Sequence, residues 1–211
     1  MDKKELLDDL KKKALQDDSL PLKSGATNLV FGVGNPDAEI LCVGEGAGYW
    51  EDQKAEPFVG NAGMLLNRLL ASINIKREEV YITNMVLHRP PENRDPLPEE
   101  IKAYQVYVDG IIEIIKPKVI LTLGRFSMGK FLPGVFISSV HGKPREMRWK
   151  GRKITVVPMY HPAAALRNGD VMQKIKNDFL DLVPILAKIN QEKDDKIEEE
   201  KEKEVEQTSL F

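Results

Sequence analysis

Cysteine is almost absent from this chain. One of its 211 residues is a cysteine, Cys42, and it lies in a short apolar run, Ile40 to Val43, that predicts a buried strand. A single cysteine excludes an intrachain disulfide and a cysteine-based metal site. Long apolar runs are lacking too, because none approaches the roughly 18 residues that span a membrane. The charged amino terminus has no apolar signal-peptide core, so we expect a cytoplasmic protein with no membrane contact.

A strong net charge is also lacking, since 31 Lys and Arg face 33 Asp and Glu. That balance is the sum of unlike parts. Residues 192–206 hold nine acids and four lysines, so the rest of the chain has a net charge of +3. Within that rest, residues 141–153 hold six Lys or Arg and one Glu. A basic surface, as nucleic-acid binding requires, is therefore compatible with the acidic total.

The order of the predicted elements defines the fold class. Apolar runs predict strands at Ile40–Val43, Val80–Ile82, Val119–Leu123 and Ile154–Val157. Helical periodicity predicts helices at residues 2–16, 61–73, 99–115, 125–132 and 171–189. Strands that alternate with helices indicate an α/β protein with a mostly parallel sheet covered on both faces.

Polar residues follow three of the predicted strands. The first strand ends in the turn Gly44-Glu45-Gly46-Ala47-Gly48, the second runs into Asn84, and the last delivers His161. In an open parallel sheet these ends share one edge, where ligands bind. Each feature also has an ordinary explanation, because Asn often ends strands and a single His is often structural. The coincidence of three polar strand ends favours a functional cleft.

Four motifs extend this interpretation to a known family. The segments GEGAG, EPFVGNAGMLLNRLL, YITNMVLHRPPENRDPLPEEI and HPAAALR resemble those of the family 4 uracil-DNA glycosylases, over about Val30 to Leu186. The resemblance implies a three-layer α/β/α sandwich with a central four-stranded parallel sheet. It also implies hydrolysis of the bond between uracil and deoxyribose in DNA, in base excision repair. The alternative is a protein that binds damaged DNA without turnover.

The resemblance also assigns roles around the base, which must be flipped out of the helix to be reached. His161 would donate to uracil O2 as negative charge develops there, with help from backbone amides at Gly46 and Ala47. Asn84 would pair with uracil O4 and N3. Phe58 would provide a stacking surface. Glu51 would be the acid that opposes the methyl group of thymine, and Glu45 would position a water.

Further residues are candidates for contact with DNA. Leu166 and Arg167 resemble the wedge that fills the gap left by the flipped base, although an ordinary helix start after Pro162 is the alternative. Five basic residues could bind phosphates without reading sequence, or could simply form a solvated basic face: Arg89, Arg94, Lys143, Arg145 and Arg148.

The chain departs from the family in its cofactor residues. Family members hold a four-iron, four-sulfur cluster with four cysteines, and the matching positions here are Asp17, Leu20, His88 and Tyr104. None can supply a thiolate, so we expect no cluster, no other metal and replacement packing at this place. A second departure is Ala47, where the family usually has proline, so the turn lacks a preset φ.

The carboxyl terminus carries a separate pattern. We expect a glycosylase-like domain at residues 1–189 and a charged tether, disordered or helical, at 190–206. The last five residues, QTSLF, resemble the peptides by which repair proteins bind sliding clamps, with Gln207, Leu210 and Phe211 as anchors. The alternative is a frayed terminus. We otherwise expect a monomer whose substrate is uracil-containing DNA.

Overall fold

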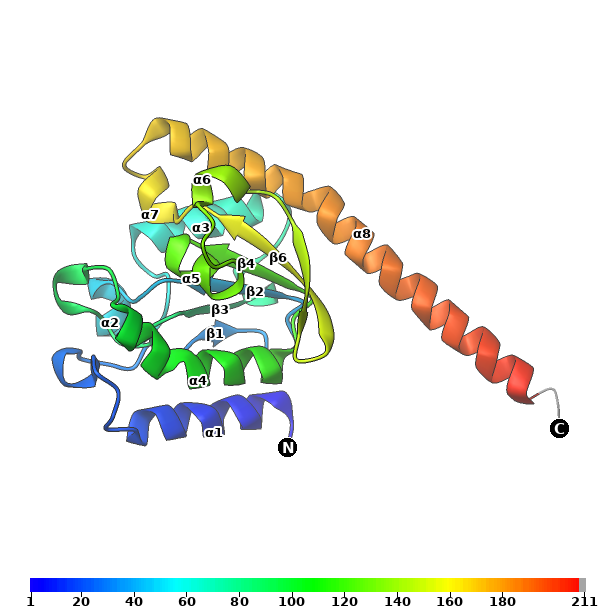
Figure 1. The fold of residues 1–211 in the computed structure, drawn as a ribbon, viewed down its shortest axis with the longest axis horizontal. Helices are drawn as coiled ribbons and strands as arrows, with labels where there is room; N and C mark the ends of the chain where they lie inside the picture. Colours follow the sequence, from blue (N-terminus) through cyan, green and yellow to red (C-terminus); the bar gives the residue numbers. More distant parts are fainter. Residues whose placement is uncertain (209–211) are drawn as a thin grey trace.

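The centre of the protein is one mixed sheet of six strands, in the order β1-β3-β2-β4-β6-β5 (Figure 1). The computed structural model describes the backbone of residues 1–208 and the side chains of residues 1–189 and 191. Parallel pairing joins the middle strands β3 (Tyr81–Asn84), β2 (Ile40–Gly44), β4 (Val119–Leu123) and β6 (Arg152–Met159). The four expected strands are therefore confirmed, with ends shifted by up to two residues.

The expectation of a sheet with four strands only is wrong, because two antiparallel strands extend its edges. At one edge, β1 (Val33–Gly34) pairs with β3, and at the other, β5 (Arg145–Trp149) pairs with β6. The first is too short to produce a sequence pattern. The second has mostly exposed, charged side chains, which edge strands tolerate and which hid it within the basic segment.

Helices cover both faces of the sheet (Figure 1). The five expected helices are present: α1 (Lys3–Gln16), α3 (Asn61–Ala71), α4 (Pro98–Ile115), α5 (Arg125–Phe131) and α8 (Gly169–Thr208). Three short helices were not predicted: α2 (Tyr49–Lys54), α6 (Ile137–Val140) and α7 (Pro162–Ala165). Single 3₁₀ turns occur at Lys23–Gly25, Arg77–Glu79 and Pro91–Asn93. The backbone of α8 continues as a helix through the expected tether and projects from the body.

The alternation of side chains along each strand builds two separate cores. Leu41 and Val43 of β2 belong to the core that includes α1 and α4, whereas Ile40 and Cys42 belong to the core with α3 and α8. Helix α1 packs on α4, so it lies outside the helix layer that covers this face of the sheet. The single cysteine is thus a fully buried core residue.

The parallel register brings the carboxyl ends of four strands to one edge. Gly44 at the end of β2 pairs with Asn84 at the end of β3, and Leu123 of β4 pairs with Met159 of β6, two residues before His161. The loops that follow these strands therefore meet there, as expected for an open parallel sheet. No helix among the described residues is long and apolar enough to cross a membrane.

Candidate active site

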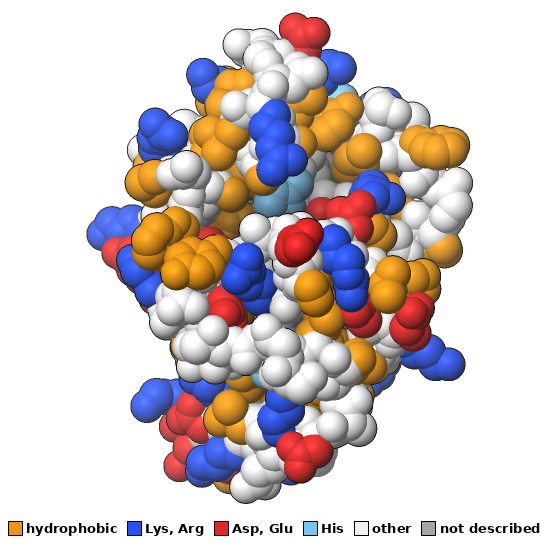
Figure 2. Space-filling model, turned by 90° about the vertical axis from the view of Figure 1, so that its left-hand side faces the viewer, with side chains coloured by type: hydrophobic (Ala, Val, Ile, Leu, Met, Phe, Trp, Pro, Cys, Tyr) orange, Lys and Arg blue, Asp and Glu red, His pale blue; other side chains and the backbone are white. Residues whose placement is uncertain are grey.

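A cavity of about 290 Å³ opens at this edge of the sheet. Figure 2 shows this face of the molecule, with a histidine side chain near its centre and basic, acidic and hydrophobic side chains around it. The cavity is lined by the turn after β2, the loop after β3 and the loop after β6: Glu45, Gly46, Ala47, Gly48, Glu51, Phe58, Ala62, Pro90, Asn93, Arg94, Asp95, Pro96, His161, Ala163 and Arg167.

The first glycine of the turn leaves no room for a side chain. A Cβ atom on Gly44 would lie 2.2 Å from Oδ1 of Asn84 and 2.6 Å from the ring of Phe58. The amide of Asn84 and the ring of Phe58 therefore pack directly on the backbone of β2. Glycine is required here for close approach and not for an unusual φ angle.

Glu51 and Phe58 are held in place by the backbone between α2 and α3. Oε1 of Glu51 accepts hydrogen bonds from the N–H groups of Val59 and Gly60, at 3.0 and 2.8 Å. Phe58 has a φ of 54°, a left-handed conformation that costs energy for a residue of this size. Its ring stacks on the imidazole of His161, with centroids 5.6 Å apart and an interplanar angle of 26°. The strained backbone thus presents a flat aromatic surface beside the histidine.

His161 is neutral, and its hydrogen bond assigns its tautomer. It occupies the N-cap of α7, where its Nδ1 accepts a hydrogen bond from the N–H of Ala163 at 3.1 Å. Burial, together with the charge of Arg167, lowers the pKa of His161 to about 4, although Glu51 opposes this shift. A neutral imidazole whose Nδ1 accepts must carry its proton on Nε2. His161 is therefore a hydrogen-bond donor through Nε2.

Glu45 also lines the cavity and is partly fixed. Its Oε1 accepts a hydrogen bond from the N–H of Phe126, at the start of α5, at 2.9 Å. Burial raises the pKa of this carboxyl group, and the hydrogen bond from Phe126 and the charge of Arg125 reduce that shift. Glu45 thus places a carboxylate in the wall of the cavity.

Asn84 lies behind the lining of the cavity. Its side chain is 1% exposed, and neither its amide nitrogen nor its amide oxygen has a hydrogen-bond partner among the described residues. An unpaired buried amide typically costs about 1–3 kcal/mol, so a retained one points to a ligand that satisfies it. Because Asn84 contacts the wall formed by Gly44 and Phe58, such a ligand would occupy the same cavity.

The predicted DNA contacts fall into a group near the cavity and a group away from it. Arg94 and Arg167 line the cavity, and the guanidinium of Arg94 makes a two-pronged ion pair with Glu100 at 2.6 and 2.9 Å. Leu166 is 44% exposed at the end of α7. Arg89 belongs to the loop after β3 that lines the cavity. The first group of predicted DNA contacts therefore lies around the opening of the cavity.

The basic residues of the β5 region lie progressively farther away. Lys143 follows Gly142, whose N–H bonds to the carbonyl of Pro158 near the end of β6. Arg145 pairs with Val156, and Arg148 pairs with Lys153 at the other end of β6. At about 3.3 Å per residue, Arg148 is roughly 25 Å along the strand from His161. The structure does not bring Arg148 together with the cavity.

Several supporting residues were missed from the sequence. Asp52 is buried and accepts hydrogen bonds from the N–H groups of Thr27 and Asn28, at 2.9 to 3.1 Å, which ties α2 to the amino-terminal loop. The lining residues of the loop after β3 were not proposed either: Pro90, Asn93, Asp95 and Pro96. Its clustered prolines were the available signal, because they stiffen a loop without secondary structure.

By the resemblance, four positions match the cluster ligands of the family: Asp17, Leu20, His88 and Tyr104. Nδ1 of His88 lies 2.7 Å from the hydroxyl of Tyr104, and both side chains are buried, as is Leu20. Asp17 is partly exposed and accepts from the hydroxyl of Tyr107 at 2.7 Å. None of the four offers a thiolate, and His88 and Tyr104 already bond to each other. They do not fit an iron-sulfur cluster, and no other group of potential metal ligands occurs among the described residues.

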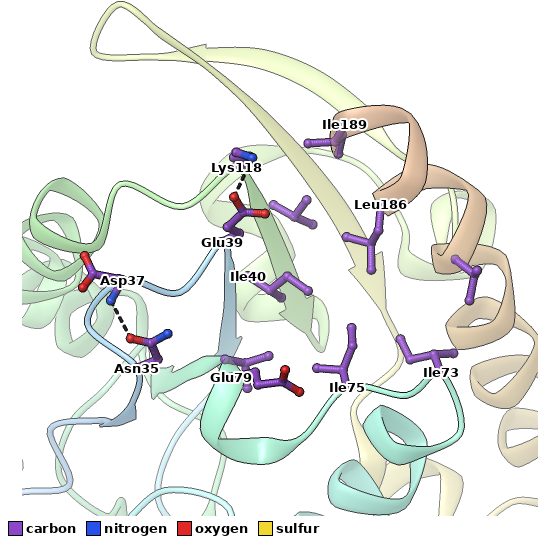
Figure 3. Close-up of a pocket in the computed structure, with 13 residues that line it drawn as sticks. Asn35, Asp37, Glu39, Ile40, Ile73, Ile75, Glu79, Lys118, Leu186 and Ile189 are labelled. Atoms are coloured by element: carbon purple, nitrogen blue, oxygen red, sulfur yellow. Dashed lines mark hydrogen bonds and ion pairs between the residues drawn. The ribbon is translucent and has the colours of Figure 1, made fainter. Parts of the chain in front are cut away.

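A larger cavity, of about 470 Å³, lies at the opposite, amino-terminal edge of the strands (Figure 3). Aliphatic side chains of β2, the loop after α3 and α8 form its inner wall, and Glu39 and Lys118 form an ion pair at 2.6 Å at its border. It contains no aromatic ring for stacking and no buried unpaired amide. The smaller cavity at the carboxyl edge is therefore the candidate active site.

Comparison with known proteins identifies the family of the chain. Residues 31–184 match the family described as the uracil DNA glycosylase superfamily. The type-4 uracil-DNA glycosylase of Archaeoglobus fulgidus is 45% identical over 181 residues, which cover 83% of this chain and 90% of that protein. That of Thermotoga maritima is 44% identical, covering 79% of this chain and 86% of its own, and that of Sulfurisphaera tokodaii is 45% identical, covering 72% of each. The chain therefore belongs to the uracil DNA glycosylase superfamily, and within it to the type-4 uracil-DNA glycosylases.

Proposed function

We propose that this chain hydrolyses the N-glycosidic bond of uracil in DNA with the cavity formed by Phe58, Asn84 and His161. The observation that carries the proposal is the pairing of a neutral histidine donor with a stacked aromatic ring and a buried unpaired amide. A flat heterocycle with two carbonyl oxygens and an N–H between them would satisfy all three. Uracil has this pattern, whereas cytosine presents an amino group where uracil has O4.

The geometry supports a mechanism by electrostatic stabilisation. Cleavage leaves negative charge on the uracil ring, and Nε2–H of His161 would donate to O2 as that charge develops. The backbone N–H groups of Gly46 and Ala47 are candidates to assist, because this turn forms part of the cavity wall. A neutral imidazole suits this role because it can donate a hydrogen bond from Nε2 without giving up its proton before the reaction. Phe58 would stack on the uracil ring and hold it against the turn.

The deoxyribose, which is the other fragment of the cleaved bond, must react with a water. Glu45, fixed through one oxygen by Phe126, would accept from a water with the other oxygen and direct it at the sugar. Gly46 supplies no carboxylate at the position next to it. Glu51, held by Val59 and Gly60, would border the edge of uracil that carries a methyl group in thymine. Leu166, with Arg167 beside it, would enter the gap that the flipped base leaves.

We further propose that the enzyme works without an iron-sulfur cluster. The hydrogen bond between His88 and Tyr104 and the burial of Leu20 support this, because they fill the place that corresponds to the cluster. Arg89, Arg94 and Lys143 would bind phosphates around the opening, and Arg145 and Arg148 would extend this contact along β5.

A uracil-containing oligonucleotide tests the central proposal. Cleavage of abasic products by alkali should reveal excision by the wild-type chain and excision slower by about 10²- to 10³-fold by His161→Ala. The rival function, binding of damaged DNA without turnover, predicts that both chains bind the oligonucleotide and that neither releases uracil. Excision by His161→Ala at the wild-type rate would contradict the assigned donor.

We also propose that the carboxyl terminus binds a sliding clamp. Leu210 and Phe211 lie outside the described residues, as does the side chain of Gln207, so the proposal depends on the sequence QTSLF and on the helix α8, which carries it away from the domain. Removal of residues 207–211 should abolish binding to an immobilised clamp and leave excision on free oligonucleotides unchanged. Equal clamp binding by the full and shortened chains would contradict it.

A further inference from the structure

Two adjacent aromatic side chains lie exposed beside the mouth of the active-site cavity. Tyr49 and Trp50 form the first turn of α2, and they are 48% and 59% exposed. Their rings meet edge to face, with centroids 5.2 Å apart and planes at 77°. Large aromatic rings normally bury most of their surface, so two neighbouring exposed ones mark a candidate contact surface.

These rings are joined to the cavity on both sides. Gly48 and Glu51, which flank them in sequence, line the cavity. The ring of Trp50 lies against Gly60, where a Cβ atom would be 3.7 Å from its Cδ1 atom. The guanidinium of Arg89 lies over the ring of Tyr49 at 5.2 Å, and this arginine precedes Pro90 of the cavity wall. The aromatic pair therefore belongs to the rim of the cavity.

The helix that carries the pair is rigidly attached. The buried carboxylate of Asp52 accepts from the backbone of the amino-terminal loop, and Asn28 Nδ2 donates to the carbonyl of Asp52 at 2.8 Å. Glu51 binds the amino-terminal end of α3. A surface held at three points loses little entropy when a ligand stacks on it, so it is suited to binding.

Charge and chemistry indicate what would stack there. Nε of Arg89 donates to Oδ1 of Asn93 at 2.7 Å, which fixes the guanidinium and leaves its Nη atoms for an anion. An exposed aromatic ring beside an oriented arginine fits a nucleotide, whose base stacks and whose phosphate binds the cation. Leu166 and Arg167 are on a different element of the cavity mouth, so the aromatic pair would meet a separate part of the strand.

We propose that Trp50, supported by Tyr49 and Arg89, stacks on an unpaired base directly next to the uracil in the same DNA strand. The inference rests on the proposed excision of uracil, because it takes the cavity as the place of the flipped base. It makes the aromatic pair a determinant of substrate preference, favouring single-stranded or locally opened DNA. In an intact duplex the neighbouring base stays stacked in the helix and gains less from Trp50.

The test compares three single-stranded oligonucleotides under single-turnover conditions. One contains uracil among normal bases. In the other two, the nucleotide immediately 5′ or 3′ of the uracil is replaced by tetrahydrofuran, which lacks a base. The wild-type chain should have a lower kcat/KM on one of the two substituted strands, by about 5- to 150-fold, the range of base–aromatic stacking. Trp50→Ala should show a similar loss on the normal strand and no further loss on that substituted one.

Two controls make the result decisive. Trp50→Phe keeps an aromatic face and should restore most of the rate, and Val106→Ala, which trims an exposed apolar side chain on α4, should behave as wild type. If wild type and Trp50→Ala lose equally on each substituted strand, the stacking proposal is wrong. If the wild-type chain excises no uracil from any strand, the proposed function fails instead.

Fluorescence gives an independent readout, because the chain has two tryptophans, Trp50 and Trp149. Trp149 donates to Glu113 at 2.8 Å and packs on Phe131, away from the cavity. In a Trp149→Phe chain the emission reports on Trp50. A single strand with tetrahydrofuran in place of uracil should quench it on binding. Binding that is detected by the anisotropy of labelled DNA without any quenching would overturn the proposal.

Discussion

The Nδ1 atom of His161 accepts a hydrogen bond from the N–H of Ala163, two residues further along α7, at 3.1 Å. The first turn of this helix has backbone N–H groups without intrahelical partners, and the histidine satisfies one of them as an N-cap. A structural need of the helix thus selects the tautomer that the reaction needs. The proton is therefore placed on Nε2.

We predict that His161→Ala lowers kcat by about 10²- to 10³-fold, the usual cost of one donor to a developing oxyanion. Because the lost interaction forms mainly in the transition state, KM should change little. Single-turnover excision from a uracil-containing single strand measures the effect. His161→Asn, which can still cap α7 and donates from a shorter side chain, should keep more activity than His161→Ala. A loss confined to KM would contradict the assigned role.

Asn84→Ala should separate activity from stability. It removes a buried amide without partners, so the free energy of unfolding should stay the same or rise by up to about 1–2 kcal/mol, even though the site loses its contact with uracil O4 and N3. Excision should fall by at least about 10²-fold. Thermal unfolding and excision assays on the same preparation check both halves. A clearly lowered Tm would show that Asn84 has structural partners instead.

The pH profile of excision should reflect Glu45 more than His161. Because burial raises the pKa of Glu45 above its usual 4.5 and lowers the pKa of His161 to about 4, Glu45 takes up its proton first as the pH falls. Activity should therefore decline as the pH falls towards the raised pKa of Glu45, before His161 takes up its proton. The Glu45→Gln variant should be much slower and should lack this decline. A decline with the same midpoint in Glu45→Gln would show that another group titrates.

The strand ends could be predicted from sequence because glycine and polar residues interrupt apolar runs there. Gly44, Asn84 and His161 follow such runs by one, two and four residues, and the parallel register does bring them to one edge. Side-chain pairing across distant loops could not be predicted. The contact of Glu45 with Phe126, which lies 81 residues further along the chain, depends on tertiary structure that no local pattern encodes.

The same limit explains the missed edge strand. Three of the five side chains of β5 are charged and exposed, and Met147 and Trp149 are only partly buried against the core, so the strand lacks the apolar run by which buried strands are recognised. Its pairing with β6 is made by the backbone, which has no sequence signature. Arg145 and Arg148 therefore looked like part of a basic loop, and the register shows that they are spread along a strand.

Tyr104→Phe should reveal how far the stability of the domain depends on the pair that occupies the cluster position. The Tyr104 hydroxyl bonds to Nδ1 of His88 at 2.7 Å and accepts from the N–H of Leu22, and its loss leaves both buried groups unpaired. We expect the free energy of unfolding to fall by about 1–3 kcal/mol. Tyr107→Phe, the matched control, removes a hydroxyl whose partner Asp17 is exposed to solvent, and should cost less.

The acid sensitivity of folding provides a second measure of this pair. Burial lowers the pKa of His88 to about 4, so its neutral form stabilises the folded state fully above the unfolded pKa near 6.5. That contribution should be lost progressively as the pH falls from about 6.5 towards 4, with His161, whose pKa is also about 4, adding to the same trend. Urea unfolding at several pH values should show a shallower dependence in His88→Leu than in wild type. If no cluster is bound, as proposed, chelators should change neither curve, and a Tm that depends on bound iron would refute that proposal.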